Sequence, residues 1–162
     1  GQTLGYAAMV EGKNVSWMPS YGPEMRGGTA NCITIVSDTT ISSPIVSRFD
    51  TGILLNQPSM DKFESRIKPG GIIVYESTNI LHASERKDIG VYAIAAADEA
   101  NKLNNVRIAN MILLGAFLQK KPIVSIEGIM EALKKVLPER YHNLLPVNRK
   151  ALEVGADIMS KM

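Results

Sequence analysis

The stretch that decides the fold lies between Gly52 and Tyr75 and has the sequence GILLNQPSMDKFESRIKPGGIIVY. Its two ends, Gly52 to Leu55 and Ile72 to Tyr75, are almost continuous in Ile, Val and Leu. A third apolar run of this kind extends from Val91 to Ala96. Such runs are typical of strands that are buried on both faces of a parallel sheet. The sequence therefore predicts three buried parallel strands.

The segment between the first two strands carries the signals of a helix. Pro58 suits the first turn of a helix, and the region from Ser59 to Ile67 has apolar residues at spacings of three and four. The Pro69-Gly70-Gly71 sequence is expected to end this helix. Strand, helix and strand in this order predict a crossover unit, and hence an α/β fold.

Two segments before this unit add strands. Asn14 to Met18 is expected to be a fourth strand of the parallel set. Between Thr29 and Arg48 helical periodicity is lacking, Cys32 to Val36 is rich in β-branched residues, and Pro44 suits an edge or a loop. We therefore expect antiparallel strands here, with a turn near Ser37-Asp38, and a mixed sheet overall.

The remaining segments are expected to be helical, from apolar periodicity and from flanking caps and breakers. The predicted helices are Gly1 to Glu11, Asn105 to Gln119, Ile126 to Leu137 and Pro146 to Met162. The predicted fold is a Rossmann-like three-layer α/β sandwich with a mostly parallel, mixed sheet and a helical C-terminal third. At 162 residues the chain is most simply one domain that spans residues 1–162.

Composition and charge exclude several classes of protein. Eighteen basic and sixteen acidic residues give a formal charge of +2, too small and too evenly spread for a nucleic-acid surface. The apolar stretches are shorter than the roughly 20 residues that cross a bilayer, and no basic-then-apolar signal opens the chain. We expect a cytoplasmic protein with no membrane partner.

Cysteine and histidine content indicates that the chain holds no metal by itself. Cys32 is the single cysteine, so the chain cannot supply the several thiolates of an iron–sulfur cluster. His82 and His142 stand far apart without a ligand pattern, which favours surface or structural roles.

A loop rich in glycine and proline follows the strand at Asn14 to Met18. Prolines fix φ, and glycines permit positive φ or close approach of another backbone. The loop is either a solvated turn or a functional surface. Arg26 is its best candidate for a salt bridge across a subunit boundary, or for contact with an anionic ligand such as coenzyme A. The candidate residues of this partner-facing or ligand-facing loop are Tyr21, Gly22, Pro23, Glu24, Met25, Arg26, Gly27 and Gly28.

The sequence from Glu11 to Asn31, EGKNVSWMPSYGPEMRGGTAN, resembles the gamma subunit or fused gamma domain of the thiamine-diphosphate-dependent 2-oxoacid:ferredoxin oxidoreductases. Tyr21 to Cys32 is more similar to the 2-oxoglutarate and branched-chain members than to the pyruvate members. The resemblance continues through Ser43-Pro44, Leu55 to Pro58 and Asn148 to Leu152, and covers essentially the whole chain. It implies that a strand and a glycine-rich turn come before the first helix, and that the present chain lacks them.

Polar residues at the predicted carboxyl ends of the strands mark a second candidate site, because ligands of open parallel sheets gather there. Asn56, Gln57 and Ser77 form this possible crevice. Asn56 and Gln57 are equally expected to cap a helix, and Ser77 more readily belongs to a turn. No catalytic triad, carboxylate dyad, phosphate loop or metal motif is evident, so we assign no catalytic residue.

The resemblance implies the gamma subunit of an enzyme that converts a 2-oxoacid, with 2-oxoglutarate favoured, and coenzyme A to an acyl-CoA and carbon dioxide while reducing ferredoxin. It implies alpha, beta and ferredoxin-like delta subunits as partners, which largely hold the thiamine diphosphate and iron–sulfur clusters. The chain alone is expected to bind no cofactor and not to be catalytic. One alternative is a stand-alone Rossmann-like nucleotide-binding enzyme, although no acidic residue that could hold a ribose follows Met18 directly. The other alternative is a purely structural adaptor.

Overall fold

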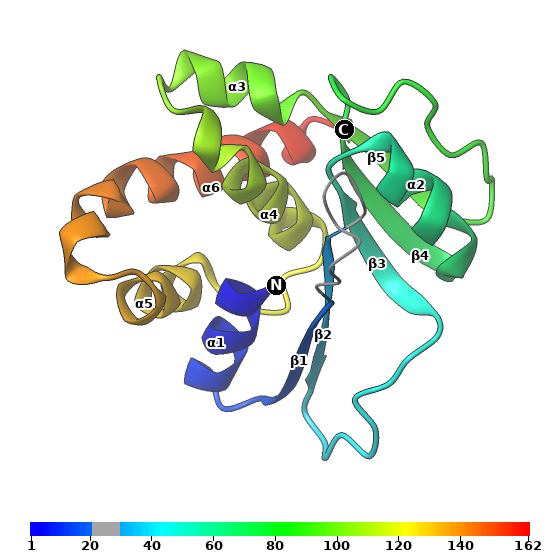
Figure 1. Ribbon diagram of the computed structural model, residues 1–162, viewed down its shortest axis with the longest axis horizontal. Helices are drawn as coiled ribbons and strands as arrows, with labels where there is room; N and C mark the ends of the chain where they lie inside the picture. The colour runs from blue at the N-terminus through cyan, green and yellow to red at the C-terminus, as the bar shows by residue number, and fades with distance from the viewer. Residues whose placement is uncertain (21–29) are drawn as a thin grey trace. The chain divides into compact units, whose positions relative to one another are not determined.

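The computed structural model describes residues 1–20 and 30–162. These residues form two compact units (Figure 1). The hairpin unit comprises Gly1–Val46 and Pro122–Pro146, and the sheet unit comprises Ser47–Lys121 and Val147–Met162. In chain order, with η for a 3-10 helix, the elements are α1 (Gln2–Val10), β1 (Asn14–Ser20), β2 (Asn31–Ser37), β3 (Phe49–Leu54), α2 (Gln57–Phe63), η1 (Glu64–Arg66), β4 (Ile67–Glu76), β5 (Gly90–Ile94), α3 (Ala96–Lys102), η2 (Val106–Ile108), α4 (Ala109–Lys120), α5 (Ile126–Val136), η3 (Glu139–Leu144) and α6 (Leu145–Ser160).

The sheet unit confirms the predicted α/β class. Its three strands have the order β3-β4-β5, and both neighbouring pairs are parallel. The connection from β3 to β4 passes through α2, as the crossover pattern predicted. The connection from β4 to β5 is a loop, residues 77–89, which reaches from the carboxyl end of one strand back to the start of the next.

The prediction that Pro69-Gly70-Gly71 merely ends a helix was wrong, because these residues lie inside β4. The helix α2 already ends at Phe63, and η1 follows it. The register to β3 shifts here, since Phe49 pairs with Ile67 but Thr51 pairs with Ile72. Gly70 has a φ of 77°, which favours glycine. The glycine pair thus makes a β-bulge and not a chain stop.

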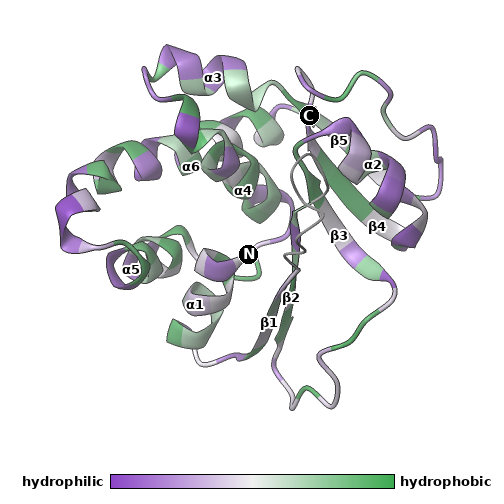
Figure 2. Ribbon diagram, in the orientation of Figure 1, coloured by the Kyte–Doolittle hydropathy of each residue, from purple (hydrophilic) through white to green (hydrophobic). Residues whose placement is uncertain are grey.

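Helices cover both faces of the parallel sheet. On one face, side chains of β3, α2 and β4 pack together with one side chain of the loop after β4. This cluster consists of Leu54, Met60, Phe63, Ile67, Ile73 and Ile80. Because side chains alternate along a strand, the buried Ile72 and Val74 face the opposite side, where α4 contacts β3 and β4 (Figure 1). Figure 2 shows a strongly hydrophobic stretch in β4, where Ile72, Ile73 and Val74 are buried, as a strand covered on both faces requires.

Two glycines let α4 and α6 approach closely. A Cβ placed on Gly115 would lie 2.0 Å from the carbonyl oxygen of Leu152. A Cβ placed on Gly155 would come even closer to the carbonyl oxygen of Ile112. The backbones of α4 and α6 are therefore in direct contact.

The three helices predicted over the C-terminal third of the chain are confirmed as α4, α5 and α6.

The hairpin unit corrects the predicted role of the first strand. Asn14 to Met18 is indeed a strand, within β1, but it pairs antiparallel with β2 and not with the parallel set. The paired ends are Ser20 and Asn31. The strand predicted at Cys32 to Val36 is confirmed as β2, but its antiparallel partner is β1. The expected second strand after a turn near Ser37-Asp38 was wrong, because residues 38–48 form no strand.

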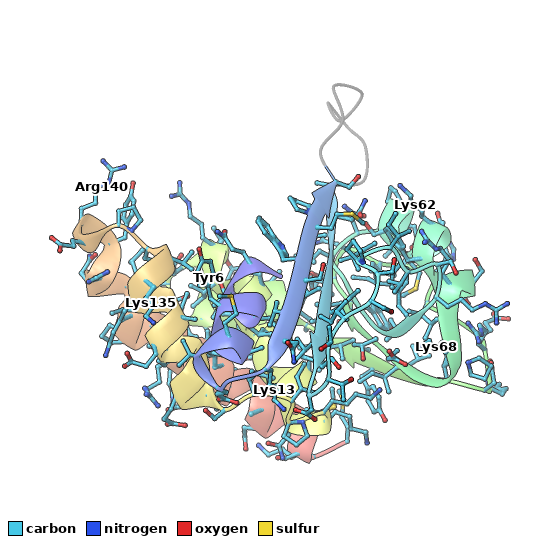
Figure 3. The ribbon with its side chains drawn as sticks, turned by 90° about the horizontal axis from the view of Figure 1, so that it is seen from below. Tyr6, Lys13, Lys62, Lys68, Lys135 and Arg140 are labelled. Atoms are coloured by element: carbon cyan, nitrogen blue, oxygen red, sulfur yellow. The ribbon has the colours of Figure 1, made fainter. Side chains whose placement is uncertain are left out.

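The two helices of the hairpin unit pack against each other and are linked by a carboxylate. Glu11, directly after α1, accepts hydrogen bonds from the backbone N (2.8 Å) and the Oγ (2.6 Å) of Ser125. Ser125 in turn accepts a bond from the N of Gly128 and so caps α5. Lys13 lies between α1 and β1 and pairs with Asp38 at 2.7 Å (Figure 3).

In the parts of the chain that the structure describes, no helix is both long and apolar enough to cross a bilayer. The expectation that residues 1–162 form one domain stays a prediction.

Candidate functional site

The carboxyl edge of the parallel sheet collects the polar residues that the sequence singled out. The strands β3, β4 and β5 run in the same direction and end at Leu54, Glu76 and Ile94. The residues that follow them therefore lie at one edge of the sheet unit, the place where ligands of open parallel sheets bind.

Asn56 and Gln57 stabilise the structure around the start of α2. The Oδ1 of Asn56 accepts a hydrogen bond from the N of Ser59 at 2.9 Å, so Asn56 is the N-cap of the helix. The side chain of Gln57 donates to Asp61 (2.8 Å) and bonds to the backbone of His82 in both directions. The capping role predicted for Asn56 is confirmed, and contact of Asn56 or Gln57 with a ligand stays a prediction.

Glu76 ends β4 with a carboxylate that is almost fully buried, at 2% exposure. Its Oε1 accepts from the N (3.1 Å) and Oγ1 (2.8 Å) of Thr78. Its Oε2 lies 2.6 Å from the same hydroxyl and 3.3 Å from the Nδ2 of Asn79. The carboxylate therefore fixes the turn that the sequence predicted at Ser77-Thr78-Asn79.

Ser77 lies next to this buried carboxylate and is half-buried. Its backbone N donates to the carbonyl oxygen of Ile94 at 2.9 Å, which ties the turn to the end of β5. Two apolar side chains of the same edge face solvent, Leu55 at 45% and Leu81 at 83% exposure. The outer surface of the edge thus combines hydroxyl, amide and apolar groups.

The other predicted site, the loop from Tyr21 to Gly28, lies outside the described residues. Its residues, including Arg26, stay candidates on the strength of the sequence alone.

Farther along the loop that begins at Ser77, an arginine fastens the chain to the sheet unit. The guanidinium of Arg86 bonds to both carboxylate oxygens of Asp88, at 2.9 and 2.5 Å. It also donates to the carbonyl oxygens of Glu64 and Ile67. The hydrogen bond from Arg86 lowers the pKa of Asp88, and the same bond raises the pKa of Arg86. This clamp limits the freedom of the loop at its far end.

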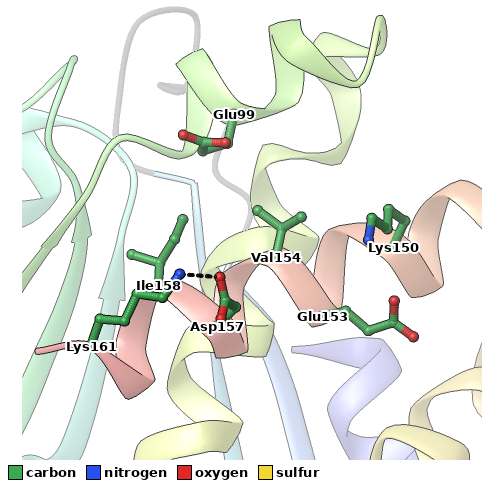
Figure 4. Close-up of a pocket in the computed structure, with 7 residues that line it drawn as sticks. All are labelled: Glu99, Lys150, Glu153, Val154, Asp157, Ile158 and Lys161. Carbon is green, nitrogen blue, oxygen red and sulfur yellow. Dashed lines mark hydrogen bonds and ion pairs between the residues drawn. The ribbon is translucent and has the colours of Figure 1, made fainter.

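A second gathering of polar side chains is a depression in the sheet unit, between α3 and α6 (Figure 4). It is lined by Glu99, Lys150, Glu153, Val154, Asp157, Ile158 and Lys161. Lys161 pairs with Asp157 at 2.6 Å, and Lys102 pairs with Glu99 at 2.7 Å, a bond that raises the pKa of Lys102. Each of these pairs joins residues three or four positions apart in sequence, so the charges pair locally and not across the depression. Glu99 belongs to the first turn of α3.

The side chains of this chain determine which of the implied cofactors it could hold. An iron–sulfur cluster needs several thiolates, and the chain has one cysteine, so its residues do not fit that group. Across residues 1–20 and 30–162, no cluster of three or more His, Cys, Asp or Glu could hold a metal ion. His142 has a structural role, since its Nε2 lies 3.1 and 3.0 Å from the carbonyl oxygens of Lys134 and Leu137.

Sequence reasoning did not single out Glu76 or the bond between Gln57 and His82. A signal for Glu76 was present, because an acidic residue at the end of an apolar strand is followed directly by Ser-Thr-Asn. Gln57 and His82 are separated by 25 positions, and nothing local marks them as partners.

Comparison with known proteins adds an independent line of argument. A family model described as pyruvate ferredoxin/flavodoxin oxidoreductase matches residues 1–158. The ketoisovalerate oxidoreductase subunit VorA of Methanothermobacter thermautotrophicus is 35% identical over 158 residues, which are 97% of this chain and 32% of that protein. The 2-oxoglutarate synthase subunit KorC of Methanocaldococcus jannaschii is 32% identical, over 94% of this chain and 83% of that protein. The chain thus spans about a third of VorA and most of KorC.

Solved structures share the fold. A keto/oxoacid ferredoxin oxidoreductase gamma subunit from Geobacter sulfurreducens aligns with a TM-score of 0.81 and 26% identity, over 99% of this chain and 89% of that chain. A 2-oxoglutarate:ferredoxin oxidoreductase from Magnetococcus marinus, solved with 2-oxoglutarate, coenzyme A and succinyl-CoA, aligns with a TM-score of 0.83 and 19% identity, over 99% of this chain and 28% of that chain. At that identity the second likeness concerns the fold.

Proposed function

Because the chain belongs to the pyruvate ferredoxin/flavodoxin oxidoreductase family, as its gamma subunit or gamma domain, we propose that it completes a cytoplasmic 2-oxoacid:ferredoxin oxidoreductase. The enzyme would oxidatively decarboxylate a 2-oxoacid with coenzyme A, releasing an acyl-CoA and carbon dioxide and reducing ferredoxin. The observation that carries this proposal is the match to a gamma subunit over 99% of the chain at a TM-score of 0.81.

The proposed substrate is a 2-oxoacid other than pyruvate. Relatives named for ketoisovalerate and for 2-oxoglutarate are 35% and 32% identical to this chain, and a relative named pyruvate synthase subunit PorC, from Methanothermobacter thermautotrophicus, is 26% identical. The sequence from Tyr21 to Cys32 supports the same two substrates, and we favour 2-oxoglutarate.

The division of cofactors follows from the residues of this chain. One cysteine cannot ligate an iron–sulfur cluster, and the sequence has no thiamine diphosphate motif, so partner subunits would hold these groups. We propose alpha, beta and ferredoxin-like delta subunits as those partners, with ferredoxin as the electron acceptor of the assembled enzyme. Coenzyme A would meet this chain at the loop from Tyr21 to Gly28 or at the carboxyl edge of the sheet unit.

The test is purification of the tagged chain from its native host under anaerobic conditions and gentle salt. Mass spectrometry of the eluate should identify thiamine-diphosphate-binding and ferredoxin-like subunits. The eluate should reduce a viologen dye with 2-oxoglutarate or 2-ketoisovalerate only when coenzyme A is added, and the higher kcat/KM names the substrate. A chain that purifies alone and binds a nucleotide would instead support a stand-alone Rossmann-like enzyme.

A further inference from the structure

We propose that Glu76 is a positioning residue of the proposed enzyme, and this inference rests on the proposed function. Its buried carboxylate holds the turn after β4 so that Ser77 meets an uncharged part of coenzyme A, the amide-bearing pantetheine arm. Glu76 itself would not touch the ligand and would act through Ser77.

The Glu76 carboxylate is buried, and its hydrogen-bond partners are neutral groups. Glu76 is 2% exposed at the end of the central strand of the sheet. The groups that bond to it are the N–H and hydroxyl of Thr78 and the amide of Asn79, all of which are neutral. A buried carboxylate is costly unless an opposite charge or several donors compensate it, and the partners found in residues 1–20 and 30–162 are neutral donors.

Stability alone does not account for an acid at this position. Burying a carboxylate costs desolvation free energy that hydrogen bonds only offset, so a buried charge is weak evidence of a gain in stability. The carboxylate does, however, supply two acceptor oxygens to one short turn, which an amide side chain cannot do. Its specific effect is therefore to fix the conformation of residues 77–79, and with them the place of Ser77.

The charge of Glu76 and the groups around it indicate which part of a ligand could bind at this turn. The Glu76 carboxylate disfavours a second anion nearby, which argues against the 2-oxoacid carboxylate or the phosphates of coenzyme A at this turn. Besides Ser77, which is half-buried, the exposed side chains of the same edge include those of Leu55, Asn56, Thr78, Asn79 and Leu81. Hydroxyl, amide and apolar groups together match a neutral chain of amides and methylene groups. The pantetheine arm is that part of the proposed substrates.

The experiment uses the assembled enzyme and measures the KM for coenzyme A, the KM for the 2-oxoacid and kcat. Thr78→Val removes the hydroxyl that bonds to Glu76, and Thr78→Ser keeps it. Glu76→Gln removes one acceptor oxygen, and Ser77→Ala removes the proposed contact. Glu131→Gln is the matched control, because Glu131 is exposed on α5 and pairs with Lys134.

The inference predicts that Ser77→Ala, Glu76→Gln and Thr78→Val each raise the KM for coenzyme A about tenfold, as the loss of one hydrogen bond would. The KM for the 2-oxoacid and kcat should change by less than about twofold, because uniform binding of one substrate is lost. Thr78→Ser and Glu131→Gln should behave as the wild type does.

Two results would overturn the inference. One is an unchanged KM for coenzyme A in Ser77→Ala. This result decides the question even if the Glu76 variants fail to fold. The other is a similar change in all kinetic constants, accompanied by loss of assembly, in both Glu76→Gln and Thr78→Val. A wild-type complex that lacks coenzyme-A-dependent activity would refute the proposed function itself, so the two failures are distinguishable.

Discussion

The side-chain amide of Gln57 bonds to the backbone of His82 in both directions, with its Nε2 donating to the carbonyl oxygen and its Oε1 accepting from the N, each at 3.0 Å. This pair joins the start of α2 to the loop between β4 and β5. Together with the Glu76 turn, it fixes the carboxyl edge of the sheet at two places, and the Arg86 clamp holds the same loop farther along, near the start of β4 and β5. The edge is therefore a built surface and not a set of free loops.

Gln57→Ala should loosen this loop. The variant leaves the N–H and carbonyl of His82 without their partner, so we expect a loss of about 1 to 2 kcal/mol in the free energy of unfolding. Denaturant unfolding measures the loss, and hydrogen exchange should be faster around His82. Gln119→Ala is the control, since Gln119 is exposed on α4. Equal unfolding curves for the two variants would contradict the bridging role.

Gly155→Ala should be among the most damaging single changes. A Cβ at this position would overlap the carbonyl oxygen of Ile112, which belongs to the backbone of α4 and cannot move without moving the helix. We expect a loss of at least about 3 kcal/mol in the free energy of unfolding, as overpacking against a rigid backbone implies. Glu153→Ala, on the exposed face of α6, should change it by less than about 0.5 kcal/mol. A soluble Gly155→Ala variant with the wild-type melting temperature would refute the close crossing of α4 and α6.

The ion pair between Arg86 and Asp88 should make the stability of the fold depend on pH in the acid range. The hydrogen bond from Arg86 lowers the pKa of Asp88 below its ordinary value of 3.8, so the unfolded chain takes up a proton more readily than the folded chain does. The stabilisation is then complete above the ordinary pKa and is lost as the pH falls through the lowered one. Asp88→Asn should therefore melt below the wild type near about pH 7 and approach it near about pH 3. A difference in melting temperature that does not shrink with acid would contradict this.

Arg26→Ala tests the proposed partner-facing loop. The sequence predicts that this arginine contacts an anionic group on a partner subunit or on coenzyme A, and a loop arginine contributes little to a core. We expect weaker assembly, or lower turnover, with an unchanged melting temperature of the chain. Arg107→Ala is the matched control, because Arg107 is exposed and lies outside both candidate sites. A large fall in melting temperature for Arg26→Ala alone would assign the arginine a structural role.

Much of the fold could be predicted because its signals are local. Asn56 caps a helix where the sequence predicted a cap, and continuous apolar runs marked β3, β4 and β5. The pairing of β1 could not be predicted in this way, because strand character at Asn14 to Met18 does not specify its partner. The helix α3, which begins at Ala96, was missed because an apolar run continues from β5 into its first residue.

The candidate site was predicted in outline only. The carboxyl ends of parallel strands follow from the strand pattern, so Asn56, Gln57 and Ser77 could be placed at one edge. The bonds that shape the edge could not be predicted, since they join positions distant in sequence, as Gln57 and His82 do, or depend on burial, as at Glu76. The family itself was recognised from the sequence between Glu11 and Asn31, and the match over residues 1–158 confirms it.

The most direct test of the central claim is reconstitution of the purified enzyme with and without this chain. The remaining subunits, stripped of the chain, are assayed for coenzyme-A-dependent reduction of a viologen dye by 2-oxoglutarate and by 2-ketoisovalerate, and the chain is then added back. We expect that activity is absent without the chain and returns in proportion to the amount of chain added, until the remaining subunits are saturated. Full activity of the stripped subunits would contradict the claim that this chain completes the enzyme.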